Sequence, residues 1–259
     1  MDKHFELTDK FIINAFGAKL FQIKCTRKIK YADIGDLGGY IEKEDNLSGN
    51  AWVFDNAQVS GNAQVSGNAQ VSGDARVFGN AWVFGNAWVF DNAWVFGDAR
   101  VFGNAQVSGN AQVSGDARVF GNAQVSGNAQ VSGNAQVSGD ARVFGDARVS
   151  GDARVFGNAW VYGDAPVFGD AWVFGHAQVF GDARVSNDNE HCGFDCFGSA
   201  NRHTHSYKTK SGKIEITCGC FRGSIEEFEK QIKETHRGNE FERQYIAIVE
   251  VIKIKFGLK

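Results

Sequence analysis

The chain has 259 residues, a net charge of −3, 32 glycines and a single proline. This near balance of charge excludes the broad basic surface that nucleic-acid-binding proteins carry. No uncharged apolar run is long enough to span a membrane, and the charged start of the chain, Met1–Glu6, lacks the apolar segment of a secretory signal.

Residues 1–48 predict an N-terminal β cap and the first coil of a larger structure. Phe11–Ile13 and Leu20–Ile23 are short apolar runs of the kind that form strands. Ile41 and Leu47 already show the six-residue spacing of the repeat that follows. We therefore expect the first coil to lie within this segment.

Residues 49–186 consist of 23 units of six residues, without insertions, and the consensus is Gly-(Asn/Asp)-Ala-X-Val-(Ser/Phe). The third residue is always Ala and the fifth is always Val. The fourth is Gln, Arg, Trp or once Pro, and the sixth is Ser, Phe or once Tyr. A fixed period this short predicts a solenoid, in which each unit packs against its neighbours.

Alternation along a strand places the repeat Ala and Val on one face and the variable residues on the other. The Ala/Val face must be the interior, because seven of the variable residues are Arg and seven buried charges are implausible. Ser also exchanges with Phe at the sixth position, and a packed interior could not absorb that change in volume. Three strands per coil would stack residues 18 apart and give seven to eight coils.

The unit Val-X-Gly-(Asn/Asp)-Ala-X resembles the hexapeptide repeat of left-handed parallel β-helices. The resemblance implies an all-β solenoid of left hand with three strands per coil. Proteins of this superfamily include acyltransferases, which use a general-base His near loops that interrupt the coils, and a carbonic anhydrase with three His ligands to zinc. This repeat is uninterrupted and contains one histidine, His176, at a corner otherwise taken by Asn or Asp. We expect a protein that is not an enzyme; the alternative is a diverged acyltransferase with His176 in an inter-subunit site.

Aromatic residues form two belts on the predicted outer surface, and all six Trp residues occupy the fourth position of a unit. The first belt contains Phe78, Trp82, Phe84, Trp88, Phe90, Trp94, Phe96 and Phe102. The second contains Phe144, Phe156, Trp160, Tyr162, Phe168, Trp172, Phe174 and Phe180. The belts predict a contact surface for a second copy, a host protein or a small planar ligand; alternatively, stacked rings only stabilise the coils. Self-association is the favoured interpretation, because each belt encircles the rod.

Each of the seven repeat arginines follows an Asp by two positions. This pattern predicts local or inter-coil ion pairs that keep the surface soluble. The pairs are Asp74/Arg76, Asp98/Arg100, Asp116/Arg118, Asp140/Arg142, Asp146/Arg148, Asp152/Arg154 and Asp182/Arg184.

Residues 187–259 predict a small α+β module that covers the last coil. Ile214–Thr217 indicates a strand, and Ser224–Glu227 is a capping box that opens a helix expected to stop near Gly238. The apolar residues 245–256 predict either a final strand or a helix that runs into a strand.

Cysteine and histidine residues in this module are weak candidates for zinc ligands. They are Cys192, Cys196, His203, His205, Cys218 and Cys220. Their spacing lacks the tight pairs of zinc motifs, so we expect ordinary thiols and no bound metal or cofactor. The odd total of five cysteines also favours reduced thiols and an intracellular protein.

Both ends of the chain resemble uncharacterised phage and prophage proteins with hexapeptide repeats. The likeness lies in Asp36–Glu42, in Cys218–Glu229 and in Thr235–Asn239. It implies an accessory protein in the cytoplasm of the host bacterium that self-associates and engages or sequesters a host component. We expect neither nucleic acid nor a membrane as partner.

Overall fold

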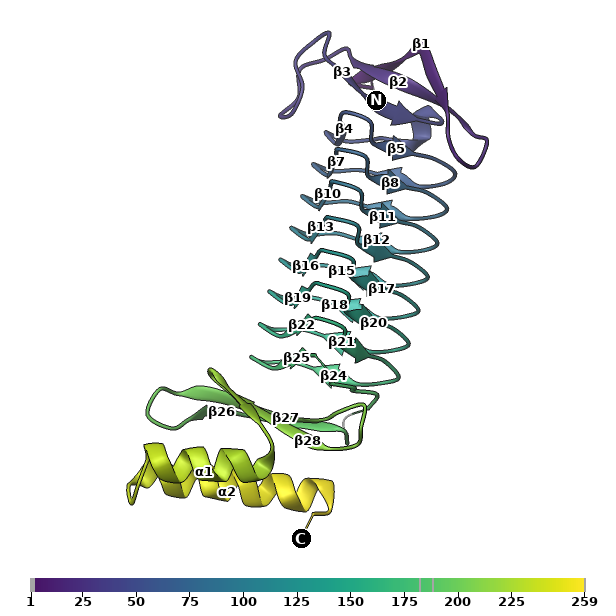
Figure 1. Cartoon of the computed structure of the whole chain (residues 1–259). Coiled ribbons are helices and arrows are strands. Elements are labelled where there is room, and N and C mark those ends of the chain that lie inside the picture. Colours follow the sequence, from purple (N-terminus) through teal and green to yellow (C-terminus); the bar gives the residue numbers. More distant parts are fainter. Residues whose placement is uncertain (1–2, 182, 188, 259) are drawn as a thin grey trace.

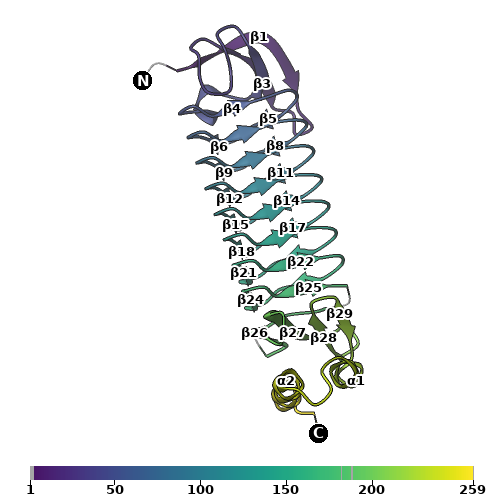
Figure 2. The same ribbon diagram turned by 90° about the vertical axis from the view of Figure 1, so that its left-hand side faces the viewer.

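The computed structural model describes residues 3–181, 183–187 and 189–258 and shows a long rod with a cap at each end (Figures 1 and 2). Three sheets of ten, eight and seven strands run the length of the rod, and a separate four-stranded sheet with two helices lies at its C-terminal end. The fold is therefore a parallel β-solenoid of about eight turns with a small α+β C-terminal part, as the repeat predicted.

Every repeat Ala and Val side chain is buried inside the rod, which confirms the predicted interior face. Strands pair in parallel with the strands 18 residues away, so that Val107 lies beside Val89 and Val125. The backbone hydrogen bonds follow the same direction: the N–H of Gln106 donates to the carbonyl of Ala123 at 2.9 Å. Each coil thus satisfies the backbone of its strands through its two neighbours.

The repeat strands are short and fall on three faces. The first face contains β5 (Gln58–Val59), β8 (Arg76–Val77), β11 (Trp94–Val95), β14 (Gln112–Val113), β17 (Gln130–Val131), β20 (Arg148–Val149) and β23 (Pro166–Val167). The second contains β6 (Gln64–Val65), β9 (Trp82–Val83), β12 (Arg100–Val101), β15 (Arg118–Val119), β18 (Gln136–Val137), β21 (Arg154–Val155) and β24 (Trp172–Val173). The third contains β4 (Trp52–Val53), β7 (Gln70–Val71), β10 (Trp88–Val89), β13 (Gln106–Val107), β16 (Gln124–Val125), β19 (Arg142–Val143), β22 (Trp160–Tyr162) and β25 (Gln178–Phe180).

The corners between strands require a left-handed backbone conformation, which explains the consensus Gly. Gly103 has φ 74°, and a Cβ atom there would lie 3.0 Å from the backbone nitrogen of Gly121. Asp55 and Asp91 stand at this position in two units with φ 51° and 59°. Asp is one of the few residues that tolerates this conformation, and the Asp91 carboxylate also accepts a hydrogen bond from the N–H of Gly109 at 3.0 Å.

The corner Asn residues form ladders of side-chain hydrogen bonds between coils. The Asn86 amide donates to Asn104, Asn104 donates to Asn122, and Asn122 donates to Asp140, over distances of 2.9–3.1 Å. An Asn side chain can both donate and accept, so it continues a ladder, whereas Asp only accepts and ends it.

The predicted pairing of each repeat Arg with the Asp two residues before it is wrong for the six pairs that the structure describes. None of them forms an ion pair within 4.0 Å, and Asp182 of the seventh pair lies outside the described residues. Five of these Asp residues instead accept hydrogen bonds from the corner Asn one coil earlier: Asp74, Asp98, Asp140, Asp146 and Asp152. Four of the six arginines lie over a Trp ring of a neighbouring coil: Arg76, Arg100, Arg142 and Arg154.

The N-terminal cap is an antiparallel extension of the first face. β1 (Phe5–Ile13) pairs with β2 (Lys19–Cys25), β2 pairs with β3 (Leu37–Ile41), and β3 then pairs in parallel with β5. A short 3-10 turn, η1 (Glu44–Asn46), follows. The buried Asn46 side-chain amide donates to the carbonyls of Gly61 and Ala63. It therefore replaces a backbone N–H that a further strand would offer to the second face.

Trp52 departs from the predicted outward position of the tryptophans, because its side chain is only 1 % exposed. The cap covers it: the His4 ring centre lies 5.9 Å from the Trp52 ring, and His4 Nε2 is 2.9 Å from the carbonyl oxygen of Ala51. The repeat pattern could not show this, since the covering residue comes from outside the repeat.

The C-terminal part is an antiparallel sheet backed by two helices. The sheet contains β26 (His191–Phe197), β27 (Arg202–Lys208), β28 (Ile214–Cys218) and β29 (Phe221–Gly223), and the helices are α1 (Ile225–Thr235) and α2 (Glu240–Phe256). The predicted capping box is confirmed, because the Ser224 and Glu227 side chains each accept a hydrogen bond from the other residue's backbone N–H.

The predicted strand within residues 245–256 is wrong: α2 is helical throughout. Asn239 caps its start by accepting from the N–H groups of Phe241 and Glu242. Tyr245, Ile248, Val249 and Ile252 then fall at helical spacing and are buried. This buried stripe outweighs the strand preference of the many β-branched residues here.

Replacing an interior residue should cost far more stability than replacing its outward neighbour. We expect Val107→Ala to lower the free energy of unfolding by about 2 kcal/mol, because it removes buried methyl groups and leaves a cavity. The matched variant Gln106→Ala should change it by less than about 0.5 kcal/mol. Urea unfolding followed by circular dichroism measures both, and equal losses would contradict the assigned interior.

Candidate functional site

Three surface clusters of Arg, Phe and Trp recur along the rod, and they form the best-defined candidate binding sites. In each cluster an Arg-Val-Phe sequence in one coil lies beside a Trp 18 residues later. The clusters are Arg76/Phe78/Trp94, Arg142/Phe144/Trp160 and Arg154/Phe156/Trp172.

The geometry of the three clusters is nearly the same. The guanidinium carbon lies 4.9–5.2 Å from the centre of the indole ring, within the range of a cation–π contact. The Phe ring meets the same indole edge-on, with ring centres 5.9–6.1 Å apart. Arg100 lies over Trp82 in a fourth pair at 5.5 Å. Arg thus fixes an aromatic ring rather than neutralising a carboxylate.

The Phe and Tyr rings of the belts stack on one another between coils. Phe84, Phe102 and Phe120 form a column with ring centres 4.8 and 4.9 Å apart and planes within 2° of parallel. Similar stacks join Phe78 to Phe96, Phe156 to Phe174, and Phe144 through Tyr162 to Phe180. These stacks support the interpretation that the Phe and Tyr residues stabilise the coils.

Four of the six Trp rings remain accessible. Trp82, Trp88, Trp160 and Trp172 are 36–45 % exposed, whereas Trp94 is half-buried. Trp88 also lies against Phe90, with ring centres 4.3 Å apart, and donates from Nε1 to the Ser72 hydroxyl at 3.0 Å. Trp82, Trp88 and Trp94 belong to β9, β10 and β11 on three different faces, so the belt surrounds the rod and forms no single flat face.

His176, the candidate base of the alternative enzyme, lies exposed at a corner of the last coil. It lines a cavity of about 310 Å³ at the junction with the C-terminal sheet, together with Gln178, Arg202 and His203. His203 Nδ1 lies 2.6 Å from a carboxylate oxygen of Asp195, which orients the ring. Asp195 was not among the predicted site residues, because it lies within a break in the register of β26 that no sequence motif marks.

The four cysteines among the six candidate zinc ligands lie in different environments, whereas the rings of His203 and His205 are neighbours, with centres 5.7 Å apart. Cys192 Sγ lies 3.0 Å from the Ser206 hydroxyl, Cys218 is buried, and Cys196 and Cys220 are exposed. Among the residues that the structure describes, no group of three His, Cys, Asp or Glu side chains is arranged to hold a metal ion.

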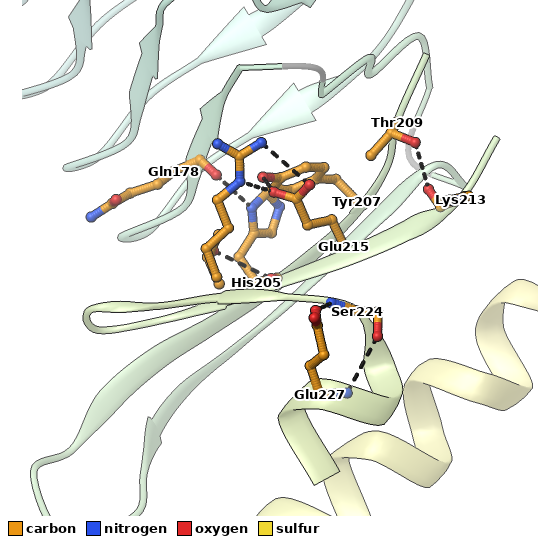
Figure 3. A network of polar contacts seen from close by, with 10 residues as sticks. Gln178, His205, Tyr207, Thr209, Lys213, Glu215, Ser224 and Glu227 are labelled. Carbon is orange, nitrogen blue, oxygen red and sulfur yellow. Dashed lines mark hydrogen bonds and ion pairs between the residues drawn. The ribbon is translucent and has the colours of Figure 1, made fainter. Parts of the chain in front are cut away.

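A polar network joins the C-terminal part to the last coil (Figure 3). The Tyr207 hydroxyl donates to Glu215 at 2.7 Å, Glu215 also pairs with Arg222, and the Arg222 guanidinium lies 4.6 Å from the centre of the Phe180 ring. Tyr207 is fully buried and belongs to the solenoid core. Burial and the neighbouring Glu215 raise the pKa of Tyr207 well above its usual value, so the hydroxyl stays protonated and can donate.

His205 extends this junction as a buried, uncharged ring. His205 Nδ1 is 3.1 Å from the carbonyl oxygen of Gln178, and Nε2 is 3.1 Å from Nδ1 of His191. Burial, followed by the neighbouring His191, lowers the pKa of His205 to about 3. The neutral ring therefore holds the module against β25 by hydrogen bonding and not by charge.

Comparison with known proteins supports the repeat and no particular activity. The sequence model of the YdcK beta solenoid repeat matches residues 69–85, 111–127, 135–149 and 147–163. The repeat match and the parallel β-solenoid fold together support a place in the β-helix repeat superfamily. No curated protein matches the chain. Neither helix in the described part of the chain is long and apolar enough to cross a membrane.

Acidification should weaken the junction. The folded state holds His205 neutral down to about pH 3, whereas the unfolded chain takes up the proton near pH 6.5. Stability from this residue is therefore complete above pH 6.5 and falls as the pH drops toward 3. Between pH 7 and pH 5 we expect a loss of about 2 kcal/mol that His205→Gln lacks.

Urea unfolding followed at 222 nm measures this loss, because α1 and α2 are the α-helices of the described chain. The other ionisable groups are the same in the wild type and in the variant, so the difference between the two pH profiles reports on His205. Parallel pH profiles for the two proteins would contradict the assignment.

Proposed function

We propose that the protein is a non-enzymatic binding scaffold that self-associates and presents its Trp rings to a second protein. The observation that carries this proposal is the set of four accessible Trp rings. Three of them lie against an Arg of the neighbouring coil, and the fourth lies against the Phe of its own unit. Trp and Arg are the residues that most often dominate binding energy at protein interfaces. A rigid rod also holds them without the entropy cost of ordering a loop.

The two groups of aromatic residues then have different roles. The stacked Phe and Tyr rings pack against Phe and Tyr rings of the neighbouring coils, so these contacts cover part of their surface within the chain. Trp82, Trp88, Trp160 and Trp172 keep more than a third of their surface open and lie on two of the three faces. This arrangement suits a scaffold that is approached from several sides better than a pocket for one small ligand.

The likeness of both ends to phage and prophage proteins suggests where the scaffold works. We place it in the cytoplasm of a bacterial host, where it would engage or sequester a host protein. The mostly reduced state of the five cysteines that we infer from the sequence is compatible with that compartment.

An acyltransferase remains the second candidate, and one observation favours it. His176 and the Asp195–His203 pair line or adjoin the same cavity, and a carboxylate that orients an imidazole is a common arrangement for a general base. Acetyl-coenzyme A turnover by the wild type that His176→Ala or His203→Ala abolishes would establish this candidate and overturn the scaffold.

Removing the Trp rings should impair binding without unfolding the rod. We expect the triple variant Trp82→Gln, Trp88→Gln, Trp94→Gln to lose most of the host proteins that the wild type retains in a pull-down. The matched control changes Gln106, Gln112 and Gln136 to Ala, which occupy the same three faces in the stretch poor in aromatics. Sedimentation velocity measures assembly, and circular dichroism confirms folding.

Two results would contradict this prediction. One is a folded Trp variant that binds host proteins as the wild type does, which would leave the Trp rings a purely structural role. The other is equal loss in the Gln-to-Ala control, since that variant leaves every aromatic ring in place.

A further inference from the structure

Helix α2 has two apolar faces, and only one of them is covered by the rest of the chain. Its inner face, which includes Ile248 and Ile252, is buried against the sheet and α1. On the other side, Val251 is 49 % exposed, Ile254 77 % and Leu258 45 %, and Ala247 is exposed as well. Ile254 is the most exposed large apolar side chain in the described part of the chain.

The spacing of the outer face is that of a helix-pairing seam. Ala247, Val251, Ile254 and Leu258 follow one another by four, three and four residues, which is the a/d pattern of a coiled coil. Leu258 lies just beyond the helix but is drawn onto its last turn, because its N–H donates to the carbonyl of Lys253 at 2.9 Å across the left-handed Gly257. A seam of this period fits another helix.

The charges of α2 indicate that this other helix is α2 of a second copy. The last turn carries Lys253 and Lys255, and Glu250 precedes them at the edge of the seam. In an antiparallel pair the basic last turn of each helix lies beside the part of the other helix that contains Glu250, and the two helix dipoles oppose one another favourably.

One antiparallel register matches both the seam and the charges. With the twofold axis between Ile252 and Lys253, Val251 faces Ile254 of the partner subunit and Ala247 faces Leu258 of the partner subunit. Glu250, at the edge of the seam, then faces Lys255 of the partner subunit. Every seam position meets an apolar residue and the flanking charges are opposite in sign.

We propose that α2 pairs antiparallel with α2 of a second copy and joins two rods through their C-terminal parts. This inference rests on the self-association in the proposed function and names its surface. Both helices lie at the end of the rod opposite the N-terminal cap, so the pairing leaves the Trp rings open (Figures 1 and 2). The seam is short, so we expect a weak dimer with a Kd on the order of 10 µM.

Sedimentation velocity of the full chain from 1 to 200 µM tests the proposal. The wild type should pass from monomer to dimer over this range, and Val251→Lys with Ile254→Lys should stay monomeric, a loss of at least tenfold in affinity. Ile34→Lys, at an exposed apolar residue of the N-terminal cap, is the matched control and should dimerise normally. Circular dichroism at 222 nm confirms that the helices are intact in each variant.

Cysteine pairing tests the orientation independently of any loss of folding. With Cys196 and Cys220 changed to Ser, Val251→Cys mixed with Ile254→Cys should form a disulfide-linked heterodimer under mild oxidation, well ahead of either homodimer. Preferential Val251→Cys homodimers would show a parallel arrangement and overturn the proposal.

The outcomes separate this proposal from the proposed function. A wild-type dimer that persists in the α2 variant but disappears in the Trp variant overturns α2 pairing and leaves self-association intact. A wild type that stays monomeric at every concentration overturns both. Loss of the dimer in the α2 variant alone, with the Trp variant still dimeric, supports α2 pairing.

Discussion

The narrow interior of the solenoid is the constraint on which the rest of the structure depends. Three short strands close each coil so tightly that only Ala and Val point inward, and every one of them is buried. Backbone hydrogen bonds leave each coil for its neighbours, so the coils stabilise one another and none is stable alone. Variation is thereby confined to the outer surface, where Gln, Arg and Trp exchange freely, and the two ends need covers of different sequence.

The repeat sequence predicts this interior because one period governs both the strands and their stacking. The same period places Arg76 beside Trp94 and Arg142 beside Trp160, so these Arg–Trp contacts could also have been predicted from the 18-residue spacing. The predicted ion pairs joined each Arg to the Asp of its own unit and did not consider the residue 18 positions away in the neighbouring coil. The burial of Trp52 by His4 and the Asp195–His203 pair depend on chain segments outside the repeat, where no period relates the partners. The β-branched residues of α2 suggested a strand, since only their tertiary partners reveal the helix.

The aromatic residues on the outer surface have two different roles. Phe and Tyr columns run parallel to the rod and stiffen it, while Trp rings project beside them and remain open. The C-terminal part adds a cover in which His205, Tyr207 and Glu215 close the last coil through hydrogen bonds. Its second helix turns one apolar face inward and the other to solvent. A scaffold built in this way would present Trp rings along its sides and pair with a second copy at one end.

Small-angle X-ray scattering tests this division of surfaces most directly, because it measures the length and the thickness of the particle separately. At concentrations where the wild type associates, pairing through α2 predicts a much longer particle than the monomer with an unchanged cross-section. A thicker particle of unchanged length would mean that the rods associate side by side through the Trp rings. That result would contradict the account of open sides and paired ends.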